Sequence, residues 1–476
     1  MIGTALVVAA ALAADPSGAA TGAPAADPAG TATAAPAGPR TVGGFGRPRL
    51  FAPEGAPRRV VLLLPGQAGG GKDVAGWAEE LAKDGALVAV LDTRGWLAAR
   101  AGSRCAYPAG DLEVLAQQLE KERGLDAYQR PTVVGLDEGA LVAWAAIAQA
   151  PAGTFAGGVA VRPCPDRPLR VKLCAGSGPK PRHLQGGDLP VLKPSPSPME
   201  VIADPRGTCP VESAARLARD LGARFGSVER TPPAAGAFDA DPAIAAALRA
   251  ALERLSAAAP KPAPPAPAGV ADLPIVEVRA AGDDPRLAIL LTGDGGWVGI
   301  DKALAGAFAQ AGVATVGLDS LKFFWKRRTP DETARAIARI VEHYGAAWRR
   351  TEVILVGYSR GADLVPFIAG RLPPAAAERL RLVAMLGPGT FAEFEVHAID
   401  LFSSVRRSSA LPTEDAVRAT AGRARMLCVM GSDEKDSLCP ALADLPWVKR
   451  IVLPGGHHFD GGYEQLAKLV LDAAKP

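Results

Sequence analysis

Short runs of apolar residues alternate with amphipathic segments along most of the chain. Arg58–Pro65 and Arg286–Thr292 are apolar runs, and each precedes a glycine-rich turn and a segment of helical periodicity, Trp77–Gly85 in one case and Lys302–Gly312 in the other. Short β-branched runs separated by helical patterns of 10–15 residues are typical of β-α-β units, whose parallel strands are buried on both faces. The pattern therefore predicts parallel sheets flanked by helices.

The two halves of the chain repeat this pattern in the same order. Each half continues with a second apolar run, a proline-led helix, a third run that ends in a glycine-rich turn, and two further similar segments. The matching pairs are Leu87–Thr93 with Val313–Ser320, the helices from Pro108 and Pro330, Gly135–Gly139 with Gly357–Gly361, Ala203–Pro210 with Gly431–Pro440, and Ala234–Asp239 with Gly455–Asp460. We therefore predict an α/β protein with two tandem copies of one doubly wound, mostly parallel sheet domain.

Composition predicts where these domains begin and end. Residues 1–14 contain an apolar run with an A-x-A pattern at Ala11–Ala13, which indicates a signal peptide, although no charged residue precedes the run. Residues 15–45 are rich in Ala and Pro and are expected to be disordered, and 259–270 has the composition of an extended linker. The two domains are expected at 46–258 and 271–476, each long enough to bury its own core.

Charge and length exclude several classes of protein. The chain has 476 residues, with 53 Lys+Arg and 50 Asp+Glu, and a formal net charge of +3. It has no concentrated basic face, so we expect no nucleic-acid partner. It also lacks the runs of about 20 apolar residues that a polytopic membrane protein needs. Small basic clusters such as Lys326–Arg328 could bring an exported protein to an anionic lipid surface.

The six cysteines suggest disulfides if the chain is exported. Cys428 and Cys439 are the only cysteines of the C-terminal half, so we predict that they pair with each other. The pairing of the other four is open, with a short Cys164–Cys174 loop as one option.

A serine with the context of a catalytic nucleophile lies in the second copy. Gly357–Gly361 has the form G-x-S-x-G and lies between the apolar run Glu352–Val356 and a helical pattern that begins at Ala362. A strand, a sharp turn and a helix around such a serine form the nucleophile elbow of α/β hydrolases, and the helix N-terminus stabilises developing negative charge. We therefore predict two α/β-hydrolase-like domains, with Ser359 as the nucleophile of the second.

The order Ser…Asp…His of this fold predicts where the other two members of the triad lie. His457, in the loop before the last helix, is the predicted base, and His458 is the alternative. Asp436 is the predicted acid because Asp436–Pro440 is similar to the D-x-x-V-P form common at this turn, and Asp433 is the alternative. The loop that should supply the acid contains Asp433, Glu434 and Asp436.

Backbone N–H groups are expected to stabilise the oxyanion. One belongs to Arg360, directly after the nucleophile, and the others to the glycine-rich loop at Asp294 and Gly295. The carboxylates of this region could recognise a cationic group, or could instead serve a turn (Asp294) and a helix cap (Asp363). The predicted substrate-contacting residues are Asp294, Trp297, Asp363 and His458. A triad of this kind needs no metal or organic cofactor.

The first copy lacks the triad, since Asp137, Arg206 and Gly236 occupy the positions of Ser359, Asp436 and His457. An aspartate nucleophile without a base to activate water would not turn over. We therefore predict that residues 46–258 form a degenerate, non-catalytic domain.

Five segments of the second copy resemble the bacterial virulence protein VirJ/AcvB family of the α/β-hydrolase superfamily. They are Leu291–Trp297, Asp319–Trp325, Arg328–Pro330, Gly357–Asp363 and Gly455–Asp460. The two-copy arrangement is similar to the AcvB form, whereas VirJ resembles the second copy only. Arg360 departs from the family pattern, in which Phe is expected after the serine.

The resemblance implies a periplasmic serine hydrolase that cleaves the aminoacyl ester of lysyl-phosphatidylglycerol to lysine and phosphatidylglycerol. The implied partners are the aminoacylated phospholipid and, peripherally, the membrane surface. Two alternatives stay open: another periplasmic esterase or lipase, and a VirJ-like adaptor that binds secretion-system proteins.

Overall fold

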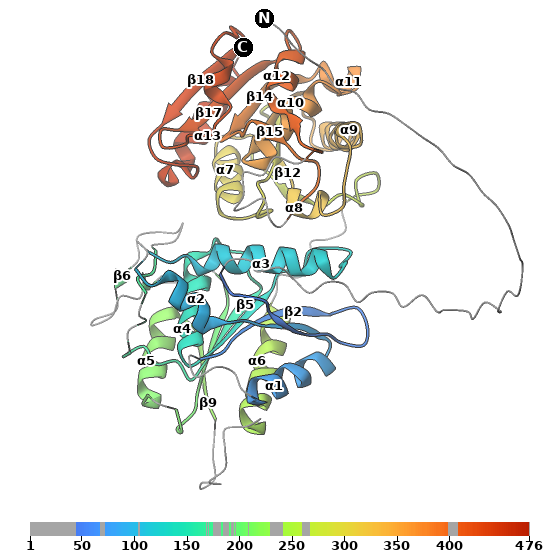
Figure 1. The fold of residues 1–476 in the computed structure, drawn as a ribbon. Helices are drawn as coiled ribbons and strands as arrows, with labels where there is room; N and C mark the ends of the chain where they lie inside the picture. The colour runs from blue at the N-terminus through green and yellow to red at the C-terminus, as the bar shows by residue number, and fades with distance from the viewer. Residues whose placement is uncertain are drawn as a thin grey trace, which may run out of the picture. The chain divides into compact units, whose positions relative to one another are not determined.

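Two seven-stranded sheets organise the chain (Figure 1). The computed structural model describes residues 44–66, 72–102, 105–167, 169, 171–174, 182–183, 190–191, 195, 197–207, 209–228, 241–258, 267–397 and 408–475. The predicted signal peptide, nearly all of the Ala/Pro-rich segment, most of the predicted linker and Gly236 lie outside these residues. Gly38–Pro476 forms one compact unit, which contains both sheets.

The first sheet has the strand order β1-β3-β2-β4-β5-β8-β9. Edge strand β1 is antiparallel to β3, and all other neighbours in the sheet are parallel. The strands are β1 Arg49–Phe51, β2 Arg59–Leu64, β3 Ala86–Val90, β4 Thr132–Leu136, β5 Gly157–Val161, β8 Met199–Ala203 and β9 Arg224–Ser227, and the short β6 Arg182–His183 and β7 Pro190–Val191 pair outside the sheet.

The second sheet repeats this topology as β10-β12-β11-β13-β14-β17-β18, again with one antiparallel edge strand, β10. Its strands are β10 Ile275–Val278, β11 Arg286–Leu291, β12 Ala314–Leu318, β13 Glu352–Tyr358, β14 Leu380–Leu386, β17 Arg425–Gly431 and β18 Val448–Leu453, with the short pair β15 Phe391–Ala392 and β16 Leu411–Pro412 outside the sheet. The identical order confirms the prediction of two mostly parallel α/β domains.

Side chains of alternate strand residues enter opposite helical layers of the second domain. Ala288 and Leu290 of β11 pack with α7 (Gly299–Gln310) and α13 (Tyr463–Ala473). Leu287, Ile289 and Leu291 pack in the other apolar cluster, with α9 (Pro330–Ala347) and α10 (Arg360–Ala369). Both sides are covered, as the uninterrupted apolar strands predict. The remaining helical segments are α8 Ser320–Phe323, α11 Pro374–Ala377, α12 Thr413–Ala419, η1 Cys439–Leu442 and η2 Phe459–Gly461.

The first domain is layered in the same way. On one face of its sheet, Val61 and Leu63 pack with α1 (Lys72–Lys83) and α6 (Pro242–Ala258). The other face meets helices that include α3 (Pro108–Glu122), α4 (Glu138–Gln149) and α5 (Val211–Leu221), and α2 (Thr93–Arg100) follows β3. Within the part of the chain that is described, no helix is both long and apolar enough to span a bilayer.

All six cysteines are paired. Cys428 is bonded to Cys439, as predicted. The suggested Cys164–Cys174 loop is wrong, because the other bridges are Cys105–Cys174 and Cys164–Cys209. Each of these joins segments that are far apart in the sequence, so the pairing depends on the folded topology.

Candidate active site

Ser359 lies on a sharp turn between β13 and α10. Its backbone has φ 53° and ψ −122°, a region that non-glycine residues rarely adopt. The flanking glycines explain how the turn is accommodated: a Cβ at Gly357 would lie 2.1 Å from the carbonyl oxygen of Gly361, and one at Gly361 would lie 2.2 Å from that of Leu291. The strained turn exposes the serine at the carboxyl end of the sheet, as in a nucleophile elbow.

A chain of hydrogen bonds links this serine to a histidine and a glutamate. His457 Nε2 lies 2.9 Å from Ser359 Oγ, and His457 Nδ1 lies 2.6 Å from Glu434 Oε1. A carboxylate at Nδ1 keeps the proton on that nitrogen, so Nε2 is free to accept the serine proton. This is the arrangement that converts a serine hydroxyl into a nucleophile.

Glu434, and not the predicted Asp436, is the acidic residue beside the histidine. The backbone turns sharply after β17, where the N–H of Glu434 donates to the carbonyl of Gly431 at 3.2 Å, and this turn brings the side chain back to the histidine. Asp436 lies two residues further along the loop, with its side chain exposed, and among the described residues it has no hydrogen bond or ion pair. The alternative, Asp433, is also exposed and accepts from the hydroxyl of Ser432 at 3.1 Å.

The environment of Glu434 favours its ionised form. Burial opposes ionisation, but hydrogen bonds from His457 and from the backbone N–H of Gly431, at 2.6 Å, outweigh it and lower the pKa of the Glu434 carboxyl. The carboxylate is therefore ready to stabilise an imidazolium on His457.

The structure distinguishes the two neighbouring histidines. His458 lies beside a tyrosine, with its Nδ1 3.0 Å from the hydroxyl of Tyr358. The same hydroxyl donates to the backbone carbonyl of His457 at 3.2 Å, and this bond supports the histidine loop. His458 therefore takes part in positioning the loop, and the structure places His457 at the serine.

Gly387, which sequence analysis did not single out, leaves space for the histidine and glutamate. It follows β14 with φ +63°, and a Cβ there would lie 2.9 Å from Cε1 of His457 and 3.5 Å from Oε1 of Glu434. A side chain at this position would displace the pair.

The glycine-rich loop after β11 approaches the serine from another side. A Cβ at Gly293 would lie 3.2 Å from the Cβ of Ser359. In α/β hydrolases the loop at this place supplies N–H groups to the oxyanion, and we therefore call it the oxyanion loop. That the N–H groups of Asp294, Gly295 and Arg360 stabilise the oxyanion stays a prediction.

The side chain of Arg360 ties this loop to the elbow. It is buried, forms an ion pair with Asp294, and donates to the carbonyls of Glu393 at 3.1 Å and Glu395 at 2.9 Å. The charge of Asp294 is thus compensated within the protein. Arg360 acts as a structural link that sequence analysis, which considered only its backbone, did not foresee.

Two other predicted substrate-contacting residues have structural contacts instead. Trp297 is 7% exposed and belongs to the apolar core, where its ring covers Gly317 so closely that a Cβ there would collide with it. Trp297 therefore has a structural role, and its contact with substrate stays a prediction. Asp363 accepts a hydrogen bond from the N–H of Gly389 at 2.6 Å, and burial raises the pKa of its carboxyl well above the usual range. It holds the loop after β14 in place.

The first copy retains the elbow without the catalytic groups. Asp137 has φ 52° and ψ −114°, and a Cβ at Gly135 would lie 2.1 Å from the carbonyl oxygen of Gly139. Arg162 follows β5 as Gly387 follows β14, also with positive φ, and its guanidinium lies 2.9 Å from the Asp137 carboxylate. In the first copy an arginine thus contacts the residue at the elbow, whereas in the second copy a histidine does, and this difference supports the prediction of a non-catalytic domain.

Fold and site together define an α/β hydrolase. The sheet order, the elbow and the serine–histidine–glutamate chain are those of the serine-dependent members of this class. Residues 285–476 match the sequence model of the family described as "Bacterial virulence protein (VirJ)". The predicted family resemblance is therefore confirmed over these residues.

Comparisons with other proteins add distant structural neighbours. No curated protein matches the chain. Similar solved structures include the ferulic acid complex of Est1E from Butyrivibrio proteoclasticus (16% identity, covering 42% of this chain and 93% of that chain, TM-score 0.31). Others are a proline iminopeptidase from Mycobacterium smegmatis (14%, 42% and 94%, TM-score 0.31) and an alpha-beta serine hydrolase homologue from Coxiella burnetii (14%, 42% and 89%, TM-score 0.28).

Proposed function

We propose that this protein is a periplasmic serine hydrolase that cleaves the aminoacyl ester of lysyl-phosphatidylglycerol, giving lysine and phosphatidylglycerol. The observation that supports hydrolysis most directly is the hydrogen-bonded chain Ser359–His457–Glu434. The substrate is proposed from the VirJ match and from the chemistry of the bond, since a carboxylic ester is a suitable target for a serine nucleophile.

The geometry supports a two-step reaction. His457 Nε2 takes the proton of Ser359 Oγ, which attacks the lysyl carbonyl carbon, while Glu434 stabilises the imidazolium. The tetrahedral intermediate collapses when the imidazolium gives its proton to the departing glycerol oxygen, and phosphatidylglycerol leaves. His457 then deprotonates a water molecule, which attacks the lysyl-serine ester. The proton returns to Ser359 Oγ as lysine is released.

The disulfides support a periplasmic location. All six cysteines are paired, and disulfides persist in oxidising compartments such as the bacterial periplasm. The Cys428–Cys439 bridge also closes the segment that contains Glu434, so an oxidising environment would help to hold the site together.

The experiment is lysine release from lysyl-phosphatidylglycerol in detergent micelles by the purified full chain, with Ser359→Ala as control. We expect release by the wild-type protein and none above background by the variant. If the wild-type protein releases no lysine but its serine is labelled by a fluorophosphonate, the site is a hydrolase of another ester. If it neither releases lysine nor is labelled, an adaptor role is favoured, and such a role would survive the serine substitution.

A further inference from the structure

Helix α3 of the first domain lies against the active-site loop of the second. A Cβ at Gly295, in the oxyanion loop, would lie 3.4 Å from Oε1 of Glu113. Gly295 is two residues from Gly293, which borders the nucleophile. The non-catalytic copy thus places a carboxylate beside the catalytic machinery of the other copy.

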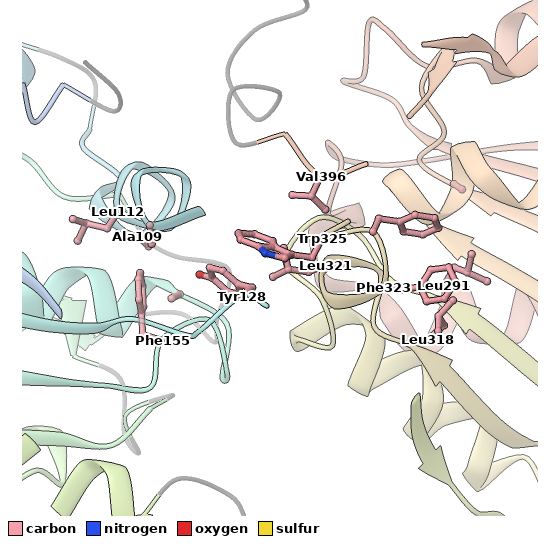
Figure 2. Packing of buried hydrophobic residues seen from close by; sticks show 14 of the residues in the cluster. Ala109, Leu112, Tyr128, Phe155, Leu291, Leu318, Leu321, Phe323, Trp325 and Val396 are labelled. Atoms are coloured by element: carbon pink, nitrogen blue, oxygen red, sulfur yellow. The ribbon is translucent and has the colours of Figure 1, made fainter. Parts of the chain in front are cut away.

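Several contacts hold the end of α3 and the segment that follows it against the second domain. The indole N–H of Trp325 donates to the carbonyl of Leu125 at 2.7 Å, and its ring lies 5.4 Å from that of Tyr128 (Figure 2). Lys121 lies 4.8 Å from the Trp325 ring and forms an ion pair with Glu395 at 3.5 Å. Since the carbonyl of Glu395 also accepts from Arg360, these contacts connect α3 to the residue that follows the nucleophile.

Glu113 differs from the other acidic residues of its helix. Asp111 accepts from Trp96 and Arg100, Glu120 from the backbone of Gln129, and Glu122 from Gln118. Glu113 is only partly exposed and, within the described part of the chain, forms no hydrogen bond or ion pair. Burial and the nearby charge of Asp294 raise its pKa to about 7. An unpaired carboxyl group in such a place is costly unless a ligand pairs with it.

A cationic ligand would supply the positively charged partner that Glu113 lacks. Asp294 is already paired with Arg360, so the uncompensated negative charge at this loop belongs to Glu113. The glycine-rich loop borders Ser359 at Gly293 and Glu113 at Gly295, so an acyl group on Ser359 that follows this loop would bring an ammonium to the carboxylate, where the two would form a charge-assisted hydrogen bond.

We propose that Glu113 is a specificity-determining residue of the active site in the second domain and binds an amino group of a cationic acyl moiety. The proposal rests on the proposed function, because it concerns the acyl group that Ser359 accepts. It gives the first copy a role in catalysis, which is to supply part of the substrate site.

The test compares the full-length wild-type chain with Glu113→Gln on three substrates. These are lysyl-phosphatidylglycerol, the p-nitrophenyl ester of lysine and p-nitrophenyl acetate, which has no cationic group. We expect the variant to raise KM for the two lysyl substrates about tenfold or more, the usual effect of losing a hydrogen bond to a charged group. Hydrolysis of the acetate should stay within about twofold of the wild-type rate.

Glu122→Gln is the matched control. It removes an exposed carboxylate from the same helix, about 13 Å further along its axis, and should leave all three activities unchanged. The melting temperature gives a second readout. Glu113→Gln removes an unpaired carboxyl and should not lower it, whereas a purely structural role would.

Two results would overturn the proposal. One is an equal loss toward the lysyl and acetyl esters, and the other is an unchanged KM for the lysyl esters. Failure of the proposed function can be distinguished from failure of the Glu113 proposal. If the wild-type chain cleaves the aryl esters but not lysyl-phosphatidylglycerol, the proposed function is contradicted. The effect of Glu113→Gln on hydrolysis of the lysyl aryl ester, relative to its effect on p-nitrophenyl acetate, then still decides the role of Glu113.

Discussion

Replacing Glu434 with glutamine should nearly abolish turnover without unfolding the protein. The two carboxylate oxygens have different partners, since Oε1 lies 2.6 Å from His457 Nδ1 and Oε2 accepts from the N–H of Gly431 at 2.6 Å. A glutamine amide has one oxygen and one NH₂ group, so it can accept from only one of these donors.

Either orientation of the amide is unfavourable. If its oxygen accepts from His457, the NH₂ group faces the N–H of Gly431, and two donors oppose each other. If its oxygen accepts from Gly431, the NH₂ group faces Nδ1 and favours the tautomer protonated at Nε2, which cannot take the proton of Ser359. The variant also loses the charge that stabilises the imidazolium. The corresponding change in serine proteases lowers kcat about 10⁴-fold, and we expect a fall of about 10³- to 10⁴-fold here.

The matched control is Asp436→Asn, which removes the acid that the sequence pattern favours. Asp436 is exposed and does not contact the histidine, so kcat of the Asp436→Asn variant should stay within about twofold of the wild-type value. The assay is p-nitrophenyl ester hydrolysis under saturating substrate, with thermal unfolding measured in parallel. If Asp436→Asn loses activity and Glu434→Gln keeps it, the assignment of the acid from the structure is refuted.

Three further predictions concern other features of the second domain. Gly387→Ala should lower kcat about 10²-fold by displacing His457. The control is Gly306→Ala, where a Cβ meets nothing within 4 Å and kcat should not change. Equal kcat values for the two variants would contradict this prediction. Replacing both Cys428 and Cys439 by serine should lower the free energy of unfolding, measured in urea titrations, by about 3 kcal/mol. The reason is that the bridge closes a loop between cysteines 11 residues apart and so lowers the conformational entropy of the unfolded chain. Burial raises the pKa of Asp301 to about 8, so the folded state retains a proton that the unfolded state releases, and stability should fall as pH rises from about 5 to 8. Asp301→Asn should flatten this fall by about 1–3 kcal/mol, and an unchanged pH profile of the melting temperature would exclude the effect.

The sequence was sufficient to predict the fold and the sharp turn at Ser359 because both depend on local pattern. Apolar runs and helical periodicity identify the strands and helices, and the glycines around Ser359 are required by the turn itself. The acid could not be chosen in this way. Asp436 and Glu434 lie in one loop, and only the backbone turn at Gly431 decides which side chain faces the histidine.

Long-range contacts account for the other differences. Trp297 lies in a glycine-rich segment of the sequence, yet its ring packs against Gly317 of the neighbouring strand β12 and belongs to the core. The Cys105–Cys174 and Cys164–Cys209 bridges join distant segments, so spacing alone could not assign them. Glu113 lies in the other copy, where no active-site motif points to it.

The two copies show how one position limits the chemistry of the fold. Gly387 and Arg162 are equivalent, since the N–H of each donates to the next strand, at Val429 and Ile202 respectively, and each has positive φ. In the second copy the missing side chain leaves room for a histidine and a glutamate beside the serine. In the first copy this position carries an arginine, whose guanidinium forms an ion pair with Asp137. We therefore expect that restoring a serine and a histidine to the first copy would not be enough for activity unless Arg162 is also replaced by glycine, because its side chain lies beside position 137.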